Sequence, residues 1–275
     1  MAKRSKRLDY ERKIKEGRGS GVFKDYKPWI TVQDFPSSGR ISRINGLKSK
    51  RQHELLSTLE KKYFFLLDFS PKVENIREQY PLLPIEDTIL IAQELGIEHP
   101  TNPKTKELEA LSTDFLITLI DENGETVEIA RTVKYKKDLL EKRVLEKFEI
   151  ERQYFNKLGI DWGLVTEEEI NNSAALFIED LYHYQDLRNF ESFKDIDNET
   201  IEDMKLFFIN KSIDYEGPLN KMCFYFDKTM GLSLGSGIVM FKHLLISKTI
   251  LINILEETDI MKHIDISINA MPEES

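Results

Sequence analysis

The sequence predicts an α/β protein in which a mixed sheet flanked by helices, over residues 29–165, is followed by a mostly helical domain, over residues 166–275. The first observation is a pair of β-prone runs, Thr113–Ile120 and Thr126–Lys134, around an Asn-Gly turn that is typical of a hairpin. The second is the order of the patterns. Helical and strand patterns alternate up to residue 165, whereas beyond it helices come first and strands last.

The elements expected before the hairpin follow from local patterns. Ser57 and Glu60 have the spacing of a capping box, in which each side chain binds the other residue's backbone N–H, and an apolar run follows them. Gly96 is placed to end a helix. The expected order is strands at Trp29–Val32 and Arg40–Ile44 around a turn at Pro36–Gly39, a helix from Ser57 to Leu67, a strand at Val73–Leu83 and a helix at Thr88–Leu95.

After the hairpin, apolar residues at helical spacing predict a helix over Leu139–Leu158, and a strand is expected at Asp161–Val165. A capping sequence at Thr166–Glu169 places the domain boundary after residue 165. The following helices and the terminal strand pair have the order of a winged-helix domain, whose third helix here offers only Lys242 and His243 as basic side chains. These elements are helices at Thr166–Leu181, Asn198–Ile213, Pro218–Thr229 and Ser233–Leu245, and strands at Ile250–Ile254 and Ile264–Ile268.

The composition limits the class of protein. Hydrophobic residues make up 40% and charged residues 32% of the chain, as in soluble globular proteins. The single cysteine, Cys223, excludes a disulfide framework, and no apolar run approaches the ~20 residues that cross a bilayer. The basic start, Met1–Arg7, lacks the apolar core of a secretory signal. We therefore expect a cytoplasmic protein.

The charge is unevenly distributed along the chain, although the total is −9. Residues 1–50 carry a net +9, residues 51–165 a net −6 and residues 166–275 a net −12. A protein that binds a polyanion usually concentrates positive charge, which here lies near the amino terminus. Residues 1–28 are therefore interpreted as a basic N-terminal arm, which is either a solvated tail or a segment that contacts DNA phosphates or a partner protein.

The hairpin brings chemically useful residues together. Side chains two apart in a strand share a face, so Thr132 and Lys134 point the same way. If Asp114 faces them across the hairpin, a carboxylate and an ammonium meet at one edge of the sheet, as in the PD-(D/E)xK nucleases. The alternative is one acid at the start of a strand and one solvated lysine. The histidines and the cysteine have no metal-ligand spacing, which excludes a zinc site of the usual kind.

The order of several short stretches resembles the TnsA endonuclease family of heteromeric bacterial transposons. Pro36-Ser37-Ser38-Gly39-Arg40 and Ile76-Arg77-Glu78-Gln79-Tyr80-Pro81-Leu82-Leu83-Pro84 are the most specific of them. The resemblance covers residues 15–170 and implies a restriction-endonuclease-like sheet. The other matching stretches are residues 15–19, Lys24–Tyr26, Pro28-Trp29, Leu59-Glu60, Ser112–Leu116, Val133-Lys134, and Leu145–Lys147 through Tyr154.

The resemblance implies a metal-dependent endonuclease that cuts the 5′ strands at transposon ends and associates with the nucleoid when assembled. Its implied partners are transposon-end DNA, a transposase subunit that cuts the 3′ ends (TnsB-like) and an AAA+ ATPase regulator (TnsC-like). It assigns the catalytic acids to Glu60 and Asp114 and the catalytic lysine to Lys134. Glu151 matches a family acid near the site. Oxygen ligands favour Mg²⁺, which Mn²⁺ would be able to replace.

One residue departs from the family pattern. Where the family often has glutamine, this chain has Thr132, whose neutral hydroxyl is a poorer Mg²⁺ ligand than a carboxamide. The expected metal ligands are therefore Glu60, Asp114, Thr132 and the Val133 backbone carbonyl, with water. The residues expected to contact DNA are Arg18, Lys24, Arg40 and Arg43.

Two other functions remain open at this point. The first is a restriction or repair nuclease of the same superfamily, which would need its own means of reading a sequence. The second is a catalytically weakened assembly module, for which Thr132 is the support. Residues 166–275 have a net charge of −12, which predicts that this domain binds a basic segment of a partner protein; the alternative is a domain that only packs against the nuclease.

Overall fold

The computed structural model describes residues 8–34, 41–101, 108–213, 215, 217–254 and 266–268. The chain divides into two compact units, Met1–Ile170 and Asn171–Ser275. The sequence placed this boundary after residue 165, just ahead of the observed division. Each unit is described by itself below.

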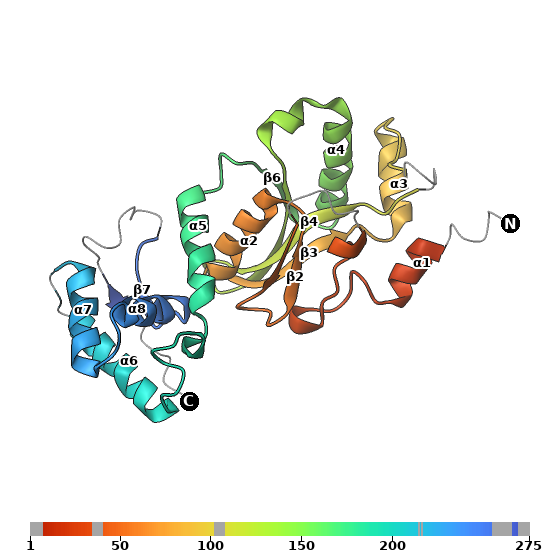
Figure 1. The fold of residues 1–275 in the computed structure, drawn as a ribbon. Coiled ribbons are helices and arrows are strands. Elements are labelled where there is room, and N and C mark those ends of the chain that lie inside the picture. Colours follow the sequence, from red (N-terminus) through yellow and green to blue (C-terminus); the bar gives the residue numbers. More distant parts are fainter. Residues whose placement is uncertain are drawn as a thin grey trace. The chain divides into compact units, whose positions relative to one another are not determined.

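The first unit is built on a mixed four-stranded sheet, which confirms the predicted fold class (Figure 1). The predicted hairpin is present and aligns Ile117 with Ile129, and Gly124 adopts the positive φ that its turn requires. β6 then joins β5 in parallel, and this makes the sheet mixed. The strand order is β3 (Val73–Pro81), β4 (Ser112–Ile120), β5 (Thr126–Val133) and β6 (Asp161–Val165).

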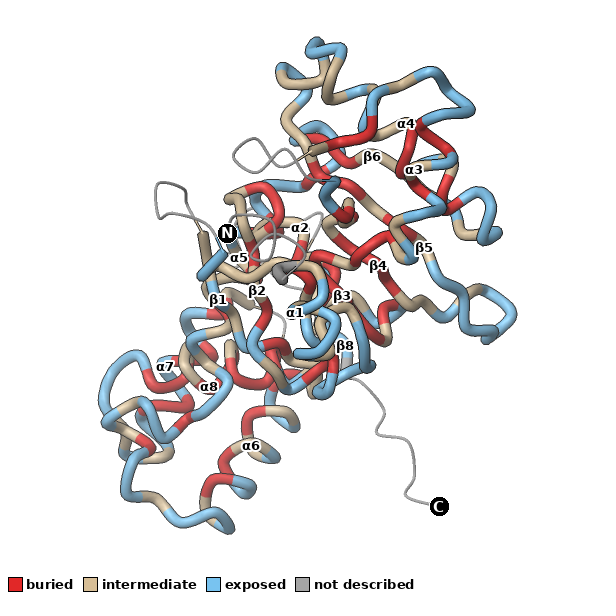
Figure 2. Tube along the Cα trace, turned by 90° about the vertical axis from the view of Figure 1, so that its right-hand side faces the viewer, coloured by how far each residue is buried: buried red, intermediate tan, exposed pale blue. Residues whose placement is uncertain are grey.

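Helices cover both faces of this sheet (Figure 1). Phe115 of β4 lies edge-on to Tyr63 of α2 (Thr58–Phe69). Its neighbour Leu116 points to the other face, where it packs in one cluster with side chains of α3 (Ile85–Glu94) and α4 (Lys142–Lys157). Both residues are almost fully buried, and Figure 2 shows the same burial along β3 and β4. Successive residues of β4 therefore belong to opposite halves of the core.

The ends of these helices follow the local sequence. The Ser57 hydroxyl accepts a hydrogen bond from the Glu60 N–H, which confirms the predicted helix start. Gly96 and Gly159 follow α3 and α4 with positive φ, as helix-ending glycines do. α4 begins at Lys142 and not at Leu139, because Leu140 is 88% exposed and does not belong to the buried stripe. A 3₁₀ turn, η3 (Lys136–Leu140), precedes α4.

The amino-terminal residues from Leu8 onward are part of the first unit and do not form a free arm. They begin with α1 (Leu8–Lys15) and continue through the 3₁₀ turn η1 (Phe23–Asp25). Tyr26 is 3% exposed, and its hydroxyl donates to the Glu78 carbonyl of β3 at 3.0 Å. Of the two alternatives for residues 1–28, the solvated tail is therefore wrong for residues 8–28, whereas contact with DNA phosphates or a partner protein stays a prediction.

The predicted pairing of two short strands near residue 40 is also wrong. Trp29 is buried, and Val32–Asp34 form a 3₁₀ turn, η2, in place of a strand end. The second strand is present as β1 (Ser42–Asn45), but its partner is β2 (Gln52–Leu55), which the sequence patterns did not indicate. The predicted turn at residues 36–39 lies outside the described residues.

The second unit is mostly helical, as predicted. Its first helix starts at Asn172, capped by the Asn171 side chain, because Thr166 and Glu169 close a separate turn upstream. The terminal strand pair is present with two described residues in each strand. The elements are α5 (Asn172–Leu181), η4 (Tyr182–Tyr184), η5 (Leu187–Asn189), α6 (Asn198–Ser212), α7 (Leu219–Met230), α8 (Ser236–Ile246), β7 (Ile250–Leu251) and β8 (Ser267–Ile268).

The basic side chains of α8 are engaged within the second unit. The Lys242 ammonium lies 2.6 Å from Asp180 and over the Tyr184 ring. His243 is buried, and its Nδ1 lies 2.9 Å from the Tyr184 carbonyl oxygen. Neither side chain points freely outward to read a DNA base. Over the described ranges, every helix is too short or too polar to traverse a lipid bilayer.

Candidate active site

One cavity of about 670 Å³ in the first unit gathers the residues that the sequence selected for catalysis and metal binding. They come from α2, β4, β5 and α4, together with the residue that follows β5. The helices pack on opposite faces of the sheet, so the cavity lies where the strand ends meet both layers. The selected residues that line it are Glu60, Asp114, Thr132, Val133, Lys134 and Glu151.

Glu60 and Asp114 share one hydrogen-bond donor. The side-chain amide of Gln79, on β3, lies 3.3 Å from Glu60 Oε2 and 3.3 Å from Asp114 Oδ1. Glu60 Oε2 also accepts from the Leu56 N–H at 2.9 Å, so the acid is anchored at the start of α2. The two carboxyl groups therefore meet on either side of one neutral amide.

Asp114 is also tied to the neighbouring strand. Its Oδ2 accepts a hydrogen bond from the Val133 N–H at 2.7 Å, where β5 ends. The positive charge of Lys134 acts on Asp114 and lowers its pKa, though less strongly than burial raises it. The Lys134 ammonium is 3.8 Å from Asp138, and its side chain is 39% exposed. Asp114 and Lys134 therefore line the same cavity, as predicted, although the Lys134 ammonium pairs with Asp138.

Glu151 belongs to a second hydrogen-bonded group beside the first. The Thr132 hydroxyl donates to Glu151 Oε2 at 2.7 Å and accepts from the Trp162 indole N–H at 3.2 Å. The Thr113 hydroxyl lies 3.1 Å from the Thr132 hydroxyl. Thr132 is 5% exposed, so its hydroxyl already has several protein partners. In this arrangement the Thr132 hydroxyl can orient the Glu151 carboxyl group. The sequence alone predicted Thr132 only as a poor metal ligand.

If all of them were ionised, the carboxyl groups of the cavity would carry more negative charge than the nearby protein neutralises. Burial raises the pKa of Glu60 to about 8, and the charge of Asp114 adds to this effect. Burial likewise raises the pKa of Asp114 to about 6 and that of Glu151 to about 8. Such shifts occur where ionised acids lack enough opposite charge, and they cluster at functional sites. A bound cation would relieve this imbalance.

The residues available for a metal ion are oxygen donors. In the ranges that the structure describes, no three His, Cys, Asp or Glu side chains come together as a complete metal-binding group. Glu60 and Asp114 are two carboxylates, and main-chain oxygens and water would have to supply the remaining ligands. Mg²⁺ is commonly bound in this way, by one or two carboxylates and several waters.

Among the residues expected to contact DNA, the three that the structure describes do not line this cavity. Arg18 is 13% exposed and pairs with Glu16 and Asp34, so it stabilises the amino-terminal segment. Arg43 lies on β1 beside Glu54 at 3.2 Å. Lys24 is exposed on η1. Arg40 lies outside the described residues.

Two residues of the site were missed by the sequence patterns. Gln79 lies in the Ile76–Pro84 stretch, but neither its spacing nor its residue type indicated a contact with two acids. Trp162 was noted only as part of a strand. The signal that could have identified Gln79 is the run of three polar residues, Arg77 to Gln79, inside a segment predicted to be a strand of the core.

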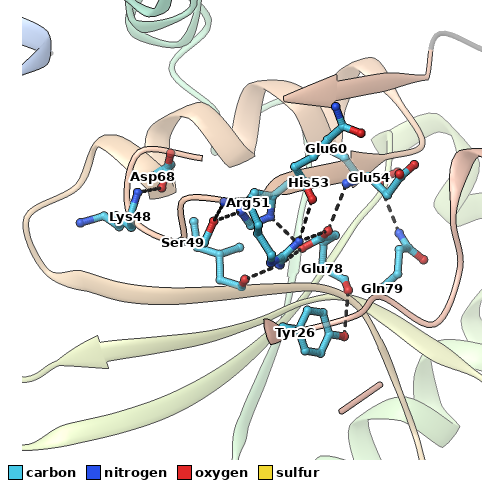
Figure 3. Close-up of polar contacts among 12 residues, drawn as sticks. Tyr26, Lys48, Ser49, Arg51, His53, Glu54, Glu60, Asp68, Glu78 and Gln79 are labelled. Carbon is cyan, nitrogen blue, oxygen red and sulfur yellow. Dashed lines mark hydrogen bonds and ion pairs between the residues drawn. The ribbon is translucent and has the colours of Figure 1, made fainter. Parts of the chain in front are cut away.

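Beside Gln79, a buried ion-pair network fixes β3 to β2 (Figure 3). Arg51 binds both carboxylate oxygens of Glu78, with Nη1 2.7 Å from Oε1. His53 Nδ1 lies 2.7 Å from Glu78 Oε2, and its Nε2 is 2.7 Å from the Ser49 hydroxyl. Although burial opposes ionisation of Glu78, the charges and hydrogen bonds of His53 and Arg51 lower its pKa to about 2.

Comparison with known proteins gives two family matches. Residues 70–167 match "TnsA-like endonuclease N terminal", and residues 169–254 match "TnsA endonuclease C terminal". The chain is also 46% identical over 171 residues to the Escherichia coli protein "Transposon Tn7 transposition protein TnsA". That alignment spans 62% of this chain and 61% of the Escherichia coli protein, less than two thirds of its length.

Proposed function

The chain belongs to the TnsA endonuclease family, and from this premise we propose that it is a metal-dependent DNA endonuclease that cleaves the 5′ strands at transposon ends. The observation that carries the proposal is the shared position of Glu60 and Asp114. Glu60 is buried and Asp114 partly buried in one cavity beside Lys134, with pKa values raised to about 8 and about 6. An arrangement of this kind suits a cation and the phosphate that the cation would bind.

Glu60 and Asp114 are the side chains that would hold Mg²⁺, or Mn²⁺ in its place. Their oxygens suit a hard cation, and their raised pKa values support binding of one because a cation favours the ionised form of each acid. Val133 would contribute its backbone carbonyl. When bound, the cation would lower the pKa of water and stabilise negative charge on the phosphate.

The protein side chains have separate tasks in phosphodiester hydrolysis, which needs a deprotonated water aligned with the leaving oxygen. Lys134 would orient this water or neutralise the charge that develops on the phosphate, since its partly exposed ammonium lies at the cavity edge. Glu151 would accept a proton or hold water, and the Thr132 hydroxyl would keep its carboxyl group oriented. Thr132 acts here through Glu151 and adds little direct ligation.

The proposed partners follow from the family. We infer that the chain acts with transposon-end DNA, with a transposase subunit that cuts the 3′ ends, and with an ATPase regulator. The acidic second unit supports the protein contacts, because residues 171–275 carry 9 Lys/Arg and 18 Asp/Glu, a net −9, and its Lys242 and His243 are engaged internally. A basic segment of a partner would be attracted to such a surface, and binding would weaken as salt rises.

The test is Asp114→Asn, in the full chain mixed with its 3′-cutting partner, transposon-end DNA labelled separately on each strand, and Mg²⁺. This variant keeps the size of the side chain and removes its charge. We expect loss of 5′-strand cleavage by at least ~100-fold, with 3′ cutting unchanged. Glu168→Gln, which changes an exposed acid outside the cavity, is the matched control.

The same assay separates the other functions. Normal 5′ cleavage by Asp114→Asn would remove this site assignment. Cleavage of unrelated duplex DNA by the chain alone would favour a restriction or repair nuclease. If the wild-type chain gave no 5′ cleavage at any Mg²⁺ concentration while 3′ cutting was normal, the assembly module would be favoured. One observation motivates this test: the Thr132 hydroxyl is already bonded to Glu151 and Trp162.

A further inference from the structure

Gln79 has an unusual backbone and an unusual set of side-chain partners. Its φ is +49°, in the left-handed region that non-glycine residues rarely adopt and that here falls within a strand. It is 3% exposed. Its Nε2 donates to Glu60 and to Asp114, and its Oε1 lies 3.4 Å from the Ser112 hydroxyl, which donates to it. A strained conformation of this kind persists only where its surroundings hold it.

Contacts from two parts of the chain, residues 26–29 and residues 51–53, hold the backbone around Gln79. The Trp29 N–H donates to the Gln79 carbonyl at 3.1 Å. The Tyr26 hydroxyl donates to the preceding carbonyl, of Glu78, at 3.0 Å. The Glu78 side chain is fixed by Arg51 and His53 of the neighbouring segment (Figure 3). This network therefore fixes the residue that precedes Gln79 in β3.

We propose that Gln79 is a positioning residue for the metal site: its neutral amide holds the Glu60 and Asp114 carboxyl groups at the separation that a divalent cation needs. The inference rests on the proposed function and adds a residue to it. Two ionised carboxylates repel one another, and an N–H donor between them weakens this repulsion without adding charge. The strained backbone aims the amide, since an ordinary strand residue would point its side chain elsewhere.

The test compares two substitutions of similar length. Gln79→Met removes the donor and keeps an unbranched neutral side chain, whereas Gln79→Glu replaces the donor with a third carboxylate. Mn²⁺ binding to the full chain is measured by titration calorimetry, and thermal unfolding is measured in a chelator and in Mn²⁺. Gln93→Met, at an exposed position of α3, is the matched control.

For Gln79→Met we expect Mn²⁺ binding about tenfold weaker, as found when a partner of a metal ligand is removed. Cleavage by this variant should need a similarly higher Mg²⁺ concentration and recover when the ion is saturating. For Gln79→Glu we expect a less stable metal-free protein and a larger stabilisation by Mn²⁺. The melting temperature should fall in chelator, because three acids repel one another, and should rise with Mn²⁺ by more than in the wild-type chain.

A role in packing alone would destabilise both variants and leave their Mn²⁺ affinity equal to that of the wild-type chain. That result would overturn the inference while leaving the proposed nuclease intact. If the wild-type chain itself failed to bind Mn²⁺ at millimolar concentration, the metal site of the proposed function would fail, and the role of Gln79 would fail with it. The two failures are therefore distinguished by the wild-type titration.

Discussion

Two acidic regions contacted by strand β3 differ in how their buried negative charge is balanced. On one side Glu78 is fully buried, and both of its oxygens are bound by Arg51, with His53 and the Glu54 N–H as further partners. Its pKa falls to about 2. This carboxylate is as ionised as an acid in water, even though no water reaches it, because its partners replace hydration.

In the cavity the balance is reversed. Glu60 and Glu151 are buried and Asp114 is partly buried, and their hydrogen-bond donors are neutral: the amide of Gln79, backbone N–H groups and the Thr132 hydroxyl. The pKa of each acid rises. The comparison teaches that a buried acid with a complete set of charged partners contributes to the fold, whereas a group of acids without them is suited to bind something positive.

The largest expected effect tests the balanced region. Arg51→Met would leave Glu78 buried with its principal charged partner removed, and we expect a loss of about 3–5 kcal/mol of unfolding free energy at pH 7, measured by urea titration. Glu60→Gln is the comparison, since it removes an ionisable acid from the unbalanced region. It should leave the stability of the metal-free protein unchanged or raised. Equal destabilisation by both variants would remove the distinction between the regions.

The pH dependence of stability should distinguish the regions next. The folded-state pKa of Glu60 and Glu151 is about 8, against 4.5 for an unperturbed glutamic acid, so their contribution is complete below pH 4.5 and is lost as the pH rises towards 8. Asp114 behaves in the same way between 3.8 and about 6. We therefore expect the metal-free protein to lose stability from pH 5 to pH 8, by up to about 1.4 kcal/mol per pH unit for each titrating acid.

Glu78 has the opposite sign. Its folded-state pKa is about 2, so its contribution is present above pH 4.5 and is lost as the pH falls towards 2. Saturating Mg²⁺ should flatten the alkaline side of the curve, because the ion binds the ionised carboxylates, and should leave the acid side unchanged. Thermal unfolding across pH 3 to 8, with and without Mg²⁺, measures both limbs. An alkaline limb that Mg²⁺ does not move would argue against a metal site in the cavity.

A smaller effect is expected at Thr132. Thr132→Val keeps the shape of the side chain but removes the hydroxyl that donates to Glu151 and accepts from Trp162, which should cost about 1–3 kcal/mol. Thr132→Ser keeps the hydroxyl and is the matched control. Urea titration gives the stability, and 5′-strand cleavage at limiting Mg²⁺ shows whether Glu151 has lost its orientation. Normal cleavage by Thr132→Val would separate Thr132 from the site chemistry.

Much of the sheet could be predicted because its signals are local. The Asn-Gly turn determined the hairpin, and Gly96 and Gly159 marked the ends of two helices. The β1–β2 pairing was missed because three of the four residues of β2, Gln52, His53 and Glu54, are polar and do not form an apolar strand pattern. Their segment is held against β3 by the ion pairs of Arg51 and His53 with Glu78. Composition along the chain does not reveal a partner that lies far away in sequence.

The site was predictable in part for a similar reason. The resemblance to the family supplied positions for Glu60, Asp114, Lys134 and Glu151, and the structure brings these residues to one cavity. Their individual roles remain predictions. The contacts of Gln79 could not be predicted, because the backbone around it is hydrogen-bonded by Tyr26 and Trp29, which lie about 50 residues earlier in the chain.

The smallest effect is expected at an exposed ion pair. It tests whether the large loss of stability expected for Arg51→Met comes from the burial of Glu78 or from its pairing alone. Glu168 lies 2.7 Å from Lys136, a distance like those in the Arg51–Glu78 pair, but both side chains are largely exposed. Water screens such a pair and already solvates each charge, so little is gained when the pair forms. Glu168→Gln should leave the urea midpoint within experimental error of the wild-type value, while Arg51→Met lowers it strongly. A large shift of the urea midpoint for Glu168→Gln would show that short ion pairs stabilise this chain whether or not they are buried. Burial would then not explain the stability that the Arg51–Glu78 pair contributes.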